Sequence, residues 1–212
     1  MGLVNSKSLE EEKRKLRLND IQRQVLVGIL LGDAHLETQN QGRTFRLKVE
    51  QSHLHKEYLM HLYEVFREWV LTPPQEKHKR SAQSNSVNWW FQTVSHAAFR
   101  FYAHQFYRDG KKHVPVLIHR FLSERSLAYW FMDDGSAKWK RSRVLLLNTQ
   151  GFTQSDVERL ADAIRDKYAV QTYLRRQAEG WQIAVSGSSR GRFEEIVKPY
   201  LVSSMMYKIE RA

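Results

Sequence analysis

The sequence predicts an α+β fold built from two similar halves, and three observations lead to this class. Two segments, 26–34 and 127–135, are each an apolar helical run that ends in aspartate. The two aspartates, Asp33 and Asp134, are 134 − 33 = 101 residues apart in a chain of 212, so we expect two copies of one unit. Strand and helix patterns recur in each half without strict βαβ alternation, which is typical of α+β proteins.

The chain begins with a charged stretch and then an apolar helix. Residues 1–20 predict an exposed arm or short helix, in which Ser8 and Glu11 have the spacing of a capping box. The apolar run at 25–31 predicts the first motif helix, and the polar residues 39–42 predict a loop.

A strand, a helix, a second strand and a second helix are expected next. Residues 45–50 alternate apolar and charged side chains, as on a half-buried strand with one charged face. Apolar residues at helical spacing predict a helix over 54–69, which two prolines terminate. A strand over 85–94 and a helix over 97–107 complete the first repeat, which we assign to residues 21–107.

Residues 108–120 form a basic linker, and residues 121–212 repeat the same order. The second motif helix, 127–132, is followed by a basic loop at 138–143 and a strand at 144–148. The remaining predicted elements are a helix over 157–168, strands over 171–176 and 181–186 that pair across the turn at 179–180, and a helix over 193–201.

The charge of the chain favours a polyanionic partner. Lys and Arg number 34 against 23 Asp and Glu, which gives a net charge of +11. Residues 1–106 carry 15 basic and 11 acidic side chains, and residues 107–212 carry 19 and 12, so both halves are basic (+4 and +7). Nucleic acid is the first candidate for such a partner, and a basic protein that is merely soluble is the alternative.

Several classes of protein are excluded or disfavoured by what the sequence lacks. Without cysteine there are no disulfides or thiolate metal sites. No apolar run reaches the roughly 18 residues of a membrane span. The nine histidines do not show zinc spacing. We find no signal peptide, and the acidic residues 10–12 are unlike a transit peptide, so we expect the protein to act where it is made.

The aspartates that end the motif helices predict a metal site. A helix C-terminus carries partial negative charge, so a carboxylate there is unfavourable, and two such ends together repel each other. A hard cation relieves this repulsion, and oxygen ligands select Mg²⁺. We therefore expect Asp33 and Asp134 to bind Mg²⁺, with main-chain carbonyls of Gly32 and Asp133 completing the set. The alternative is that each aspartate only terminates a buried helix.

Polar side chains on the predicted strands are candidates for reading DNA. A two-stranded ribbon fits the major groove, where Arg, Lys, Asn and Gln read base edges. The alternative is a solvated sheet face, which is common in antiparallel sheets. The candidates are Arg46 and Lys48 in the first half, and Lys138, Lys140, Arg143, Arg175, Arg176 and Gln182 in the second.

The motifs resemble those of the LAGLIDADG homing endonucleases of the double-motif, monomeric type. The resemblance extends over about residues 21–209. It is most specific in four segments, which are LAYWFMDDG at 127–135, LNTQ at 147–150, KPYL at 198–201 and MMYK at 205–208.

The resemblance implies a fold and a set of site residues. The fold is two pseudo-symmetric αββαββα repeats, with a central packed pair of motif helices and two β-sheet platforms that bind DNA. Asp33 and Asp134 take the place of the metal-binding aspartates. Lys112 and Lys208 resemble the basic residues beside the scissile phosphates, although a solvated linker lysine is the alternative for Lys112. Glu50 matches an acidic position near the first active site, and Asn148 and Gln150 sit in the corresponding strand of the second half as candidate DNA contacts.

Two positions depart from the family pattern. Tyr129 stands where a small residue is usual, so we expect the motif helices not to reach their tightest contact there. Ala34 follows Asp33 in place of glycine, so the first motif helix must end without a left-handed glycine.

The expected activity is Mg²⁺-dependent, site-specific hydrolysis of double-stranded DNA. The resemblance implies a monomer that cuts both strands across the minor groove of a long asymmetric site and leaves 3′ overhangs. Cleavage of this kind initiates intron homing in the family that the chain resembles. It also suggests an organellar origin, mitochondrial or chloroplast, with synthesis in place. The alternatives are an RNA-binding intron maturase on the same fold and a non-catalytic DNA-binding regulator, since a scaffold does not fix a function.

Overall fold

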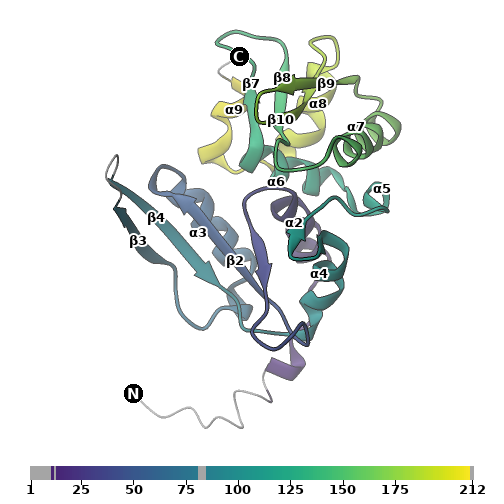
Figure 1. Cartoon of the computed structure of the whole chain (residues 1–212). Coiled ribbons are helices and arrows are strands. Elements are labelled where there is room, and N and C mark those ends of the chain that lie inside the picture. Colours follow the sequence, from purple (N-terminus) through teal and green to yellow (C-terminus); the bar gives the residue numbers. More distant parts are fainter. Residues whose placement is uncertain (1–10, 12, 81–84, 211–212) are drawn as a thin grey trace. The chain divides into compact units, whose positions relative to one another are not determined.

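The computed structural model describes residues 11, 13–80 and 85–210 of the chain. The chain divides into two compact units, shown in Figure 1. Unit 1 contains Met1–Arg23 and His35–Phe101, and unit 2 contains Gln24–Ala34 and Tyr102–Ala212. The end of the first motif helix thus groups with the second half, whereas the repeat and linker boundaries 21–107, 108–120 and 121–212 remain a prediction. Much of the predicted arm, including Ser8, lies outside the described residues.

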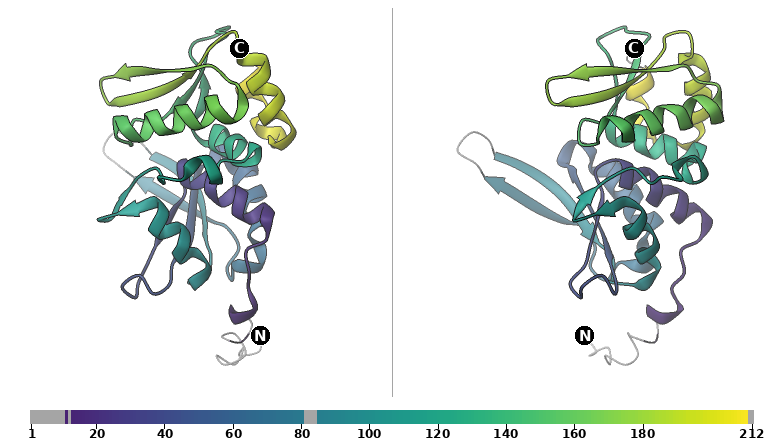
Figure 2. Two further views of the ribbon diagram at one scale, coloured as in Figure 1. Left: turned by 90° about the vertical axis from the view of Figure 1, so that its right-hand side faces the viewer. Right: turned by 45° about the vertical axis from the view of Figure 1, so that its right-hand side comes forward.

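Unit 1 is built around a four-stranded antiparallel sheet in the order β1-β2-β4-β3. Its strands are β1 (His35–Glu37), β2 (Arg46–Ser52), β3 (Gln75–Arg80) and β4 (Asn85–Gln92). Alternation in β2 is complete, because every second residue from Leu47 to Gln51 is buried. Helix α3 (Lys56–Val65) packs on β2 and β4 and covers the apolar face of the sheet (Figures 1 and 2). The opposite, polar face is left uncovered by α3.

The helices that begin in unit 1 differ in detail from the predicted ones. The predicted helix over 54–69 is three pieces, namely a 3-10 turn at His53–His55, α3, and a 3-10 turn at Arg67–Trp69. The predicted helix over 97–107 is a 3-10 turn at Ala97–Phe99 followed by α4 (Arg100–Phe106). In both segments the helical spacing predicted more buried residues than the structure has, because Leu54 and Phe101 are 77% and 53% exposed.

The first motif helix, α2 (Asp20–Leu31), starts with a capping box that the sequence analysis missed. Asn19 Oδ1 accepts from the Gln22 main-chain N–H at 2.8 Å, and the Gln22 side chain accepts from the Asn19 N–H at 3.0 Å. These reciprocal bonds satisfy two donors that a helix start leaves unpaired. They fix where the helix begins, and therefore where its twelve residues end.

Unit 2 contains a sheet of the same order, β7-β8-β10-β9. Helix α7 packs on β9 and β10 (Figure 2), and α6 packs on α8. The elements are a hairpin of β5 (Tyr107–Arg108) and β6 (Lys111–Lys112), α5 (Ile118–Phe121), α6 (Glu124–Asp134), β7 (Gly135–Ala137), β8 (Leu145–Asn148), α7 (Gln154–Tyr168), β9 (Thr172–Gln177), β10 (Gly180–Val185), α8 (Arg190–Val197), 3-10 turns at Lys198–Tyr200 and Ser203–Met205, and α9 (Tyr207–Glu210).

The two halves have the same topology, which confirms the predicted αββαββα repeat. The first half runs α2-β1-β2-α3-β3-β4-α4, and the second runs α6-β7-β8-α7-β9-β10-α8. Both sheets place their strands in the order first, second, fourth, third. Among the described residues, no helix combines the length and the apolarity needed to cross a bilayer.

Within unit 2 the two motif helices pack unusually closely. A Cβ atom added to Gly28 of α2 would lie 2.5 Å from the Ser126 carbonyl oxygen and 2.8 Å from the Tyr129 Cβ of α6. Such distances leave no space for a side chain at position 28. The expectation that Tyr129 would hold the helices apart is therefore wrong. The close approach depends on the missing side chain of Gly28, and Tyr129 itself is buried with 5% exposure.

Candidate active site and DNA-facing surfaces

The ends of the two motif helices lie in unit 2, and each is closed by a lysine. Lys112, from β6, donates to the carbonyls of Gly32 and Ala34 at 2.8 Å each. Lys208, from α9, donates to the carbonyls of Met132 at 2.5 Å and Asp133 at 3.0 Å. Helix C-terminal carbonyls need such partners. A left-handed glycine often provides these partners at a helix end, but none of the residues at either helix end has a positive φ. The two lysines provide them instead.

Lys112 is placed by a tight hairpin and is not a solvated linker lysine. Asp109 and Gly110 join β5 to β6 with φ angles of 51° and 74°, the left-handed values of a two-residue hairpin turn. Burial lowers the pKa of Lys112, and Asp134, Asp133 and Asp33 oppose this shift. Its ammonium group therefore interacts with an acidic cluster at the helix ends, which consists of Asp33, Asp133 and Asp134.

Lys208 has the same electrostatic environment as Lys112. Burial lowers the pKa of Lys208, and the charges of Asp133, Asp134 and Asp33 act in the opposite direction. The two ammonium groups come from unrelated elements, β6 and α9, yet each contacts the C-terminus of one motif helix. The site therefore has one lysine for each motif.

The aspartates at the helix ends differ in their surroundings. Asp33 is exposed, whereas Asp134 is half-buried. Burial, followed by the charge of Asp33, raises the pKa of Asp134 to about 7, and the charges of both lysines only partly compensate. Repulsion between the two carboxylates is the condition from which the sequence analysis inferred a cation.

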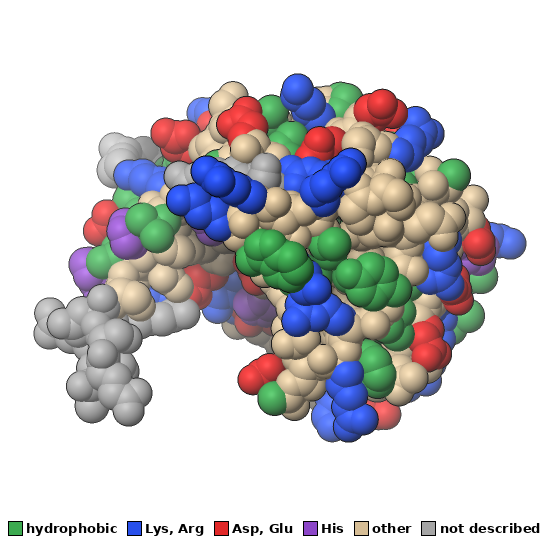
Figure 3. All heavy atoms as spheres, turned by 90° about the horizontal axis from the view of Figure 1, so that it is seen from above, with side chains coloured by type: hydrophobic (Ala, Val, Ile, Leu, Met, Phe, Trp, Pro, Cys, Tyr) green, Lys and Arg blue, Asp and Glu red, His purple; other side chains and the backbone are tan. Residues whose placement is uncertain are grey.

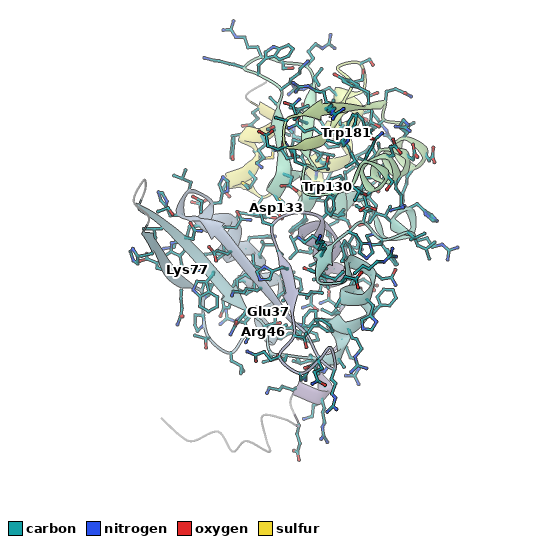
Figure 4. All side chains as sticks on the ribbon, in the orientation of Figure 1. Glu37, Arg46, Lys77, Trp130, Asp133 and Trp181 are labelled. Atoms are coloured by element: carbon teal, nitrogen blue, oxygen red, sulfur yellow. The ribbon has the colours of Figure 1, made fainter. Side chains whose placement is uncertain are left out.

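Asp133 joins the two motif helices at this end. Its carboxylate accepts a hydrogen bond from the main-chain N–H of Asp33 at 3.2 Å. A Cβ atom on Gly32 would lie 2.3 Å from the same carboxylate oxygen, so this contact requires glycine. Figure 4 labels Asp133 and Trp130 on α6. The role of Gly32 and Asp133 in positioning the helix ends was not predicted.

Two clefts of unit 2 flank the helix ends. One, of about 320 Å³, is lined by Gly32, Lys112, Asp134, Asn148 and Gln150. The other, of about 1040 Å³, is lined by Asp133, Lys140, Asn148 and Lys208 among others. Residues that the sequence analysis selected on separate grounds are therefore brought together, and Asn148 lies between the two clefts.

The donor set fits a hard divalent cation. It consists of the carboxylates of Asp33 and Asp134 and the carbonyls of Gly32 and Asp133, all of them oxygen ligands. No group of three or more His, Cys, Asp or Glu side chains suited to a metal occurs among the described residues, so carbonyls or other oxygens must complete the coordination. The carbonyls already accept from lysines, but each carbonyl oxygen has a second lone pair.

The face of the unit 1 sheet opposite α3 is polar and internally paired. Arg46 and Glu37 form an ion pair at 2.5 Å and lie side by side in Figure 4. Lys48 lies over the ring of Trp90, 5.6 Å from its centroid. Glu50 is bound by Lys77 at 2.9 Å on this face. Its predicted place near the first active site remains a prediction, since Asp33 belongs to the other unit.

Part of this face was not predicted, because the sequence of β3 gives no strand signal. That strand, QEKHKR, has no apolar alternation. Its pairing with β4 places Gln75 beside Trp90 and Lys77 beside Asn88, on the same face as Glu50. Asn88 also donates to Glu50 at 2.7 Å. Only the register of the sheet identifies these residues as neighbours.

In unit 2 the predicted polar residues divide between the two faces of the sheet. Asn148, Gln182 and Arg175 are adjacent across β8, β10 and β9 and share one face. Arg176 lies on the opposite face, where its guanidinium is 5.9 Å from the ring of Trp181. Gln182 is only 8% exposed, so its side chain is less accessible than a base-reading role requires.

The loop between β7 and β8 carries a basic, exposed cluster. Lys140 and Arg143 are exposed, and Lys138 lies over the ring of Trp139 at 4.4 Å. Trp139 is itself 59% exposed, which is unusual for tryptophan. Figure 3 shows basic side chains across the face in view, interspersed with acidic ones.

Comparisons with known proteins agree with this architecture. Residues 23–193 match the LAGLIDADG DNA endonuclease family. The chain is 32% identical over 210 residues to DNA endonuclease I-ChuI of Chlamydomonas applanata, covering 92% of this chain and 96% of that protein. It is also 32% identical to the probable intron-encoded endonuclease 1 of Wickerhamomyces canadensis, covering 97% and 91%.

A solved structure has the same fold along nearly the whole chain. It is the homing endonuclease I-WcaI bound to its DNA recognition sequence, which is 30% identical, has a TM-score of 0.91, and matches 99% of this chain and 94% of its own. The family match extends over most of the sequence and includes both motif segments, 26–34 and 127–135. The chain belongs to the LAGLIDADG DNA endonuclease family.

Proposed function

We propose that this protein is a site-specific DNA endonuclease that cuts both strands in a Mg²⁺-dependent reaction. The observation that carries the proposal is the pair of aspartates at the ends of two closely packed helices, with a half-buried lysine at each end. By the family resemblance, cleavage takes place across the minor groove of a long asymmetric site, leaves 3′ overhangs and requires one copy of the chain.

Asp33 and Asp134 are the proposed metal ligands, assisted by the carbonyls of Gly32 and Asp133. A bound divalent ion supplies an activated water and stabilises the leaving oxygen. The protein contributes the position of these ligands, because the two helix ends are fixed by the Gly28 contact and by the Asp133 bond to Asp33. Mutual repulsion of the carboxylates favours the ion-bound state.

Lys112 and Lys208 have a second role in this proposal. Each is held by helix-end carbonyls with an ammonium group beside the acidic cluster. Preorganised cations of this kind stabilise the negative charge that develops on a phosphate in the transition state. Because they are already oriented, no reorganisation is needed when the DNA is cut.

The two sheet faces are the proposed surfaces for DNA recognition. Arg46 and Lys48 belong to the polar face of unit 1 and Arg175 to that of unit 2. Several of these side chains are already paired, so they must exchange partners on binding. The loop residues Lys138, Lys140 and Arg143 are proposed to contact phosphates, and Arg176, on the opposite face, is the weakest of the predicted contacts.

A cleavage selection tests the proposed function directly. The protein is incubated with a randomised long-duplex library in Mg²⁺ or in EDTA, and the new ends are sequenced. We expect metal-dependent ends with 3′ overhangs that converge on one asymmetric site. A folded protein that yields no such ends from a diverse library would support the maturase alternative, for which binding of intron RNA is the decisive assay.

Replacing Lys112 with Met should slow cleavage by about 10²–10³-fold, the usual effect of losing a preorganised charge-stabilising group. The matched control is Lys111→Met, which removes the same charge from an exposed neighbour in the same strand. The first-order cleavage rate at saturating enzyme is the measurement. Equal rates for the two variants would show that Lys112 acts only through its charge in the overall field.

An organellar origin is part of the same proposal. It rests on the resemblance to intron-encoded endonucleases, one of which is the relative from Wickerhamomyces canadensis.

Salt-sensitive binding cannot separate the endonuclease from its rivals, since any protein that contacts phosphates releases counterions.

A further inference from the structure

A chain of side-chain hydrogen bonds connects the sheet of unit 2 to the end of the second motif helix. Asn148, on β8, donates from Nδ2 to the Asp134 carbonyl at 2.9 Å. Gln182, directly opposite on β10, donates from Nε2 to Asn148 Oδ1 at 2.6 Å. The bonds run from Gln182 through Asn148 to Asp134, so the last carbonyl of α6 is held by the sheet.

The direction of this chain is fixed by its chemistry. A main-chain carbonyl only accepts, so the Asn148 atom that faces Asp134 must be the amide nitrogen. The other Asn148 atom is then an oxygen, and the Gln182 atom that faces it must be a nitrogen donor. The orientation of both amides therefore follows from the Asp134 carbonyl.

The remaining polar atom of the Gln182 side chain is its Oε1 oxygen. This oxygen is buried and accepts no hydrogen bond among the described residues. A buried acceptor without a partner costs free energy, and an apolar side chain of similar size would avoid this cost. Gln182 is therefore a poor choice for stability alone, and its benefit must come from the bond to Asn148.

The side chains at the equivalent positions of the first half cannot form this chain of amide hydrogen bonds. Sheet register makes Glu50 the counterpart of Asn148. His35 and Ser136 each follow a motif aspartate by two residues, and they pair with Lys48 and Leu146. Glu50 and Asn148 each lie two residues further along the chain. Trp90 then takes the place of Gln182. Glu50 is bound by Lys77 and Asn88 of its own sheet. A carboxylate only accepts hydrogen bonds and cannot donate to a helix-end carbonyl, so the chain of amide bonds is specific to the Asp134 side.

We propose that Gln182 is a positioning residue for Asp134, acting through Asn148. It holds the Asn148 amide in the orientation that donates to the Asp134 carbonyl, and so it sets the end of α6 from which the Asp134 carboxylate projects. The inference rests on the proposed function of Asp134. Because the chain of bonds exists on one side only, its loss should impair one of the two strand cleavages more than the other.

Two substitutions at Gln182 separate orientation from packing. Gln182→Met keeps the size but loses the donor. Gln182→Glu presents only acceptors, which favours turning the Asn148 amide away from Asp134. The charge control is Gln177→Glu on β9 of the same sheet, because the only partner of the Gln177 side chain within the described part of the chain is the Arg176 carbonyl of its own strand. The substrate is a supercoiled plasmid that carries the site found by the cleavage selection.

We expect both Gln182 variants to accumulate nicked plasmid, with the second strand break slowed about 10–100-fold, as for other residues that orient a metal ligand. Ca²⁺ binding to the protein–DNA complex, measured by calorimetry, should weaken by a similar factor. DNA binding in EDTA should match that of the parent protein for Gln182→Met and that of Gln177→Glu for Gln182→Glu. The melting temperature of Gln182→Met should equal or exceed that of the parent protein.

Other outcomes overturn the inference or the function beneath it. Equal slowing of both strands, or a Gln182→Glu protein that behaves like Gln177→Glu, excludes a positioning role. A Gln182→Met protein that melts earlier and cleaves in proportion to its folded fraction assigns Gln182 to packing. If the parent protein cuts no site, or Asp134→Asn cuts normally, the proposed function itself has failed.

Discussion

An Asp134→Asn variant is expected to lose DNA cleavage by at least about 10²–10³-fold while becoming more stable at pH 8. Cleavage falls because a neutral amide binds a divalent cation far less well than a carboxylate does. Binding of uncut DNA should persist, since the change removes one charge from a surface with many basic groups. The measurements are the single-turnover cleavage rate and the affinity for the site in EDTA.

The gain in stability follows from the pKa of Asp134. Burial, together with Asp33, raises this pKa to about 7, whereas the unfolded chain has an ordinary value near 3.8. Between these values the folded protein binds more protons than the unfolded chain, so its stability falls as the pH rises. Above pH 7 the cost is complete and amounts to at most about 4 kcal/mol, which Asn avoids.

The pH dependence is the decisive part of this prediction. The gain in melting temperature of Asp134→Asn, up to roughly 10 °C at pH 8, should shrink steadily as the pH falls from 7 towards 4. Asp109→Asn serves as control, because Asp109 is exposed in a hairpin turn whose left-handed backbone also suits Asn. A gain that is independent of pH would contradict the electrostatic explanation, and retained cleavage would contradict the metal role.

Residues that show a strong local pattern were predictable from the sequence. The alternation in β2 and the repeat of the motif helices each reflect a face that must be buried, so spacing alone identifies them. The strands β9 and β10 were found for the same reason, together with their turn. The shared topology of the halves then follows from the repeat.

Features that depend on distant partners were not predictable in this way. The strand β3 has no alternation because one of its edges and much of its surface face solvent, so only pairing with β4 defines it. Lys112 looked like a linker lysine because its partners, the carbonyls of Gly32 and Ala34, are about eighty residues away. Gln182 was assigned to a DNA-reading face because it is polar. It is in fact only 8% exposed, and it donates to Asn148 on another strand.

The contact between the motif helices shows the same limit and leads to the second large effect. Tyr129 suggested a wider separation, because side-chain size was judged one helix at a time. The distance depends on which residue of the other helix lies opposite, and that residue is Gly28, with the Ser126 carbonyl beside it. Main-chain atoms cannot move aside as a flexible side chain does.

Gly28→Ala should therefore destabilise the protein, although alanine is the better helix former by about 1 kcal/mol. The added Cβ would lie 2.5 Å from the Ser126 oxygen and 2.8 Å from the Tyr129 Cβ, so the helices must separate. Overpacking of this kind costs about 1–3 kcal/mol, and a branched residue costs more. We expect a net loss of about 1–2 kcal/mol for Gly28→Ala, and an unfolded or aggregated protein for Gly28→Val.

The control for Gly28→Ala is Gly191→Ala in α8, where a Cβ would meet no atom within 4 Å. That variant should gain up to about 1 kcal/mol, because only the helix propensity changes. Chemical denaturation gives both free energies of unfolding. Separation of the helices also moves Asp33 relative to Asp134, so Gly28→Ala should cleave more slowly even where it is fully folded. If Gly28→Ala instead gained stability as Gly191→Ala does, the helices would yield at this contact, and the geometry of the aspartates would be set elsewhere.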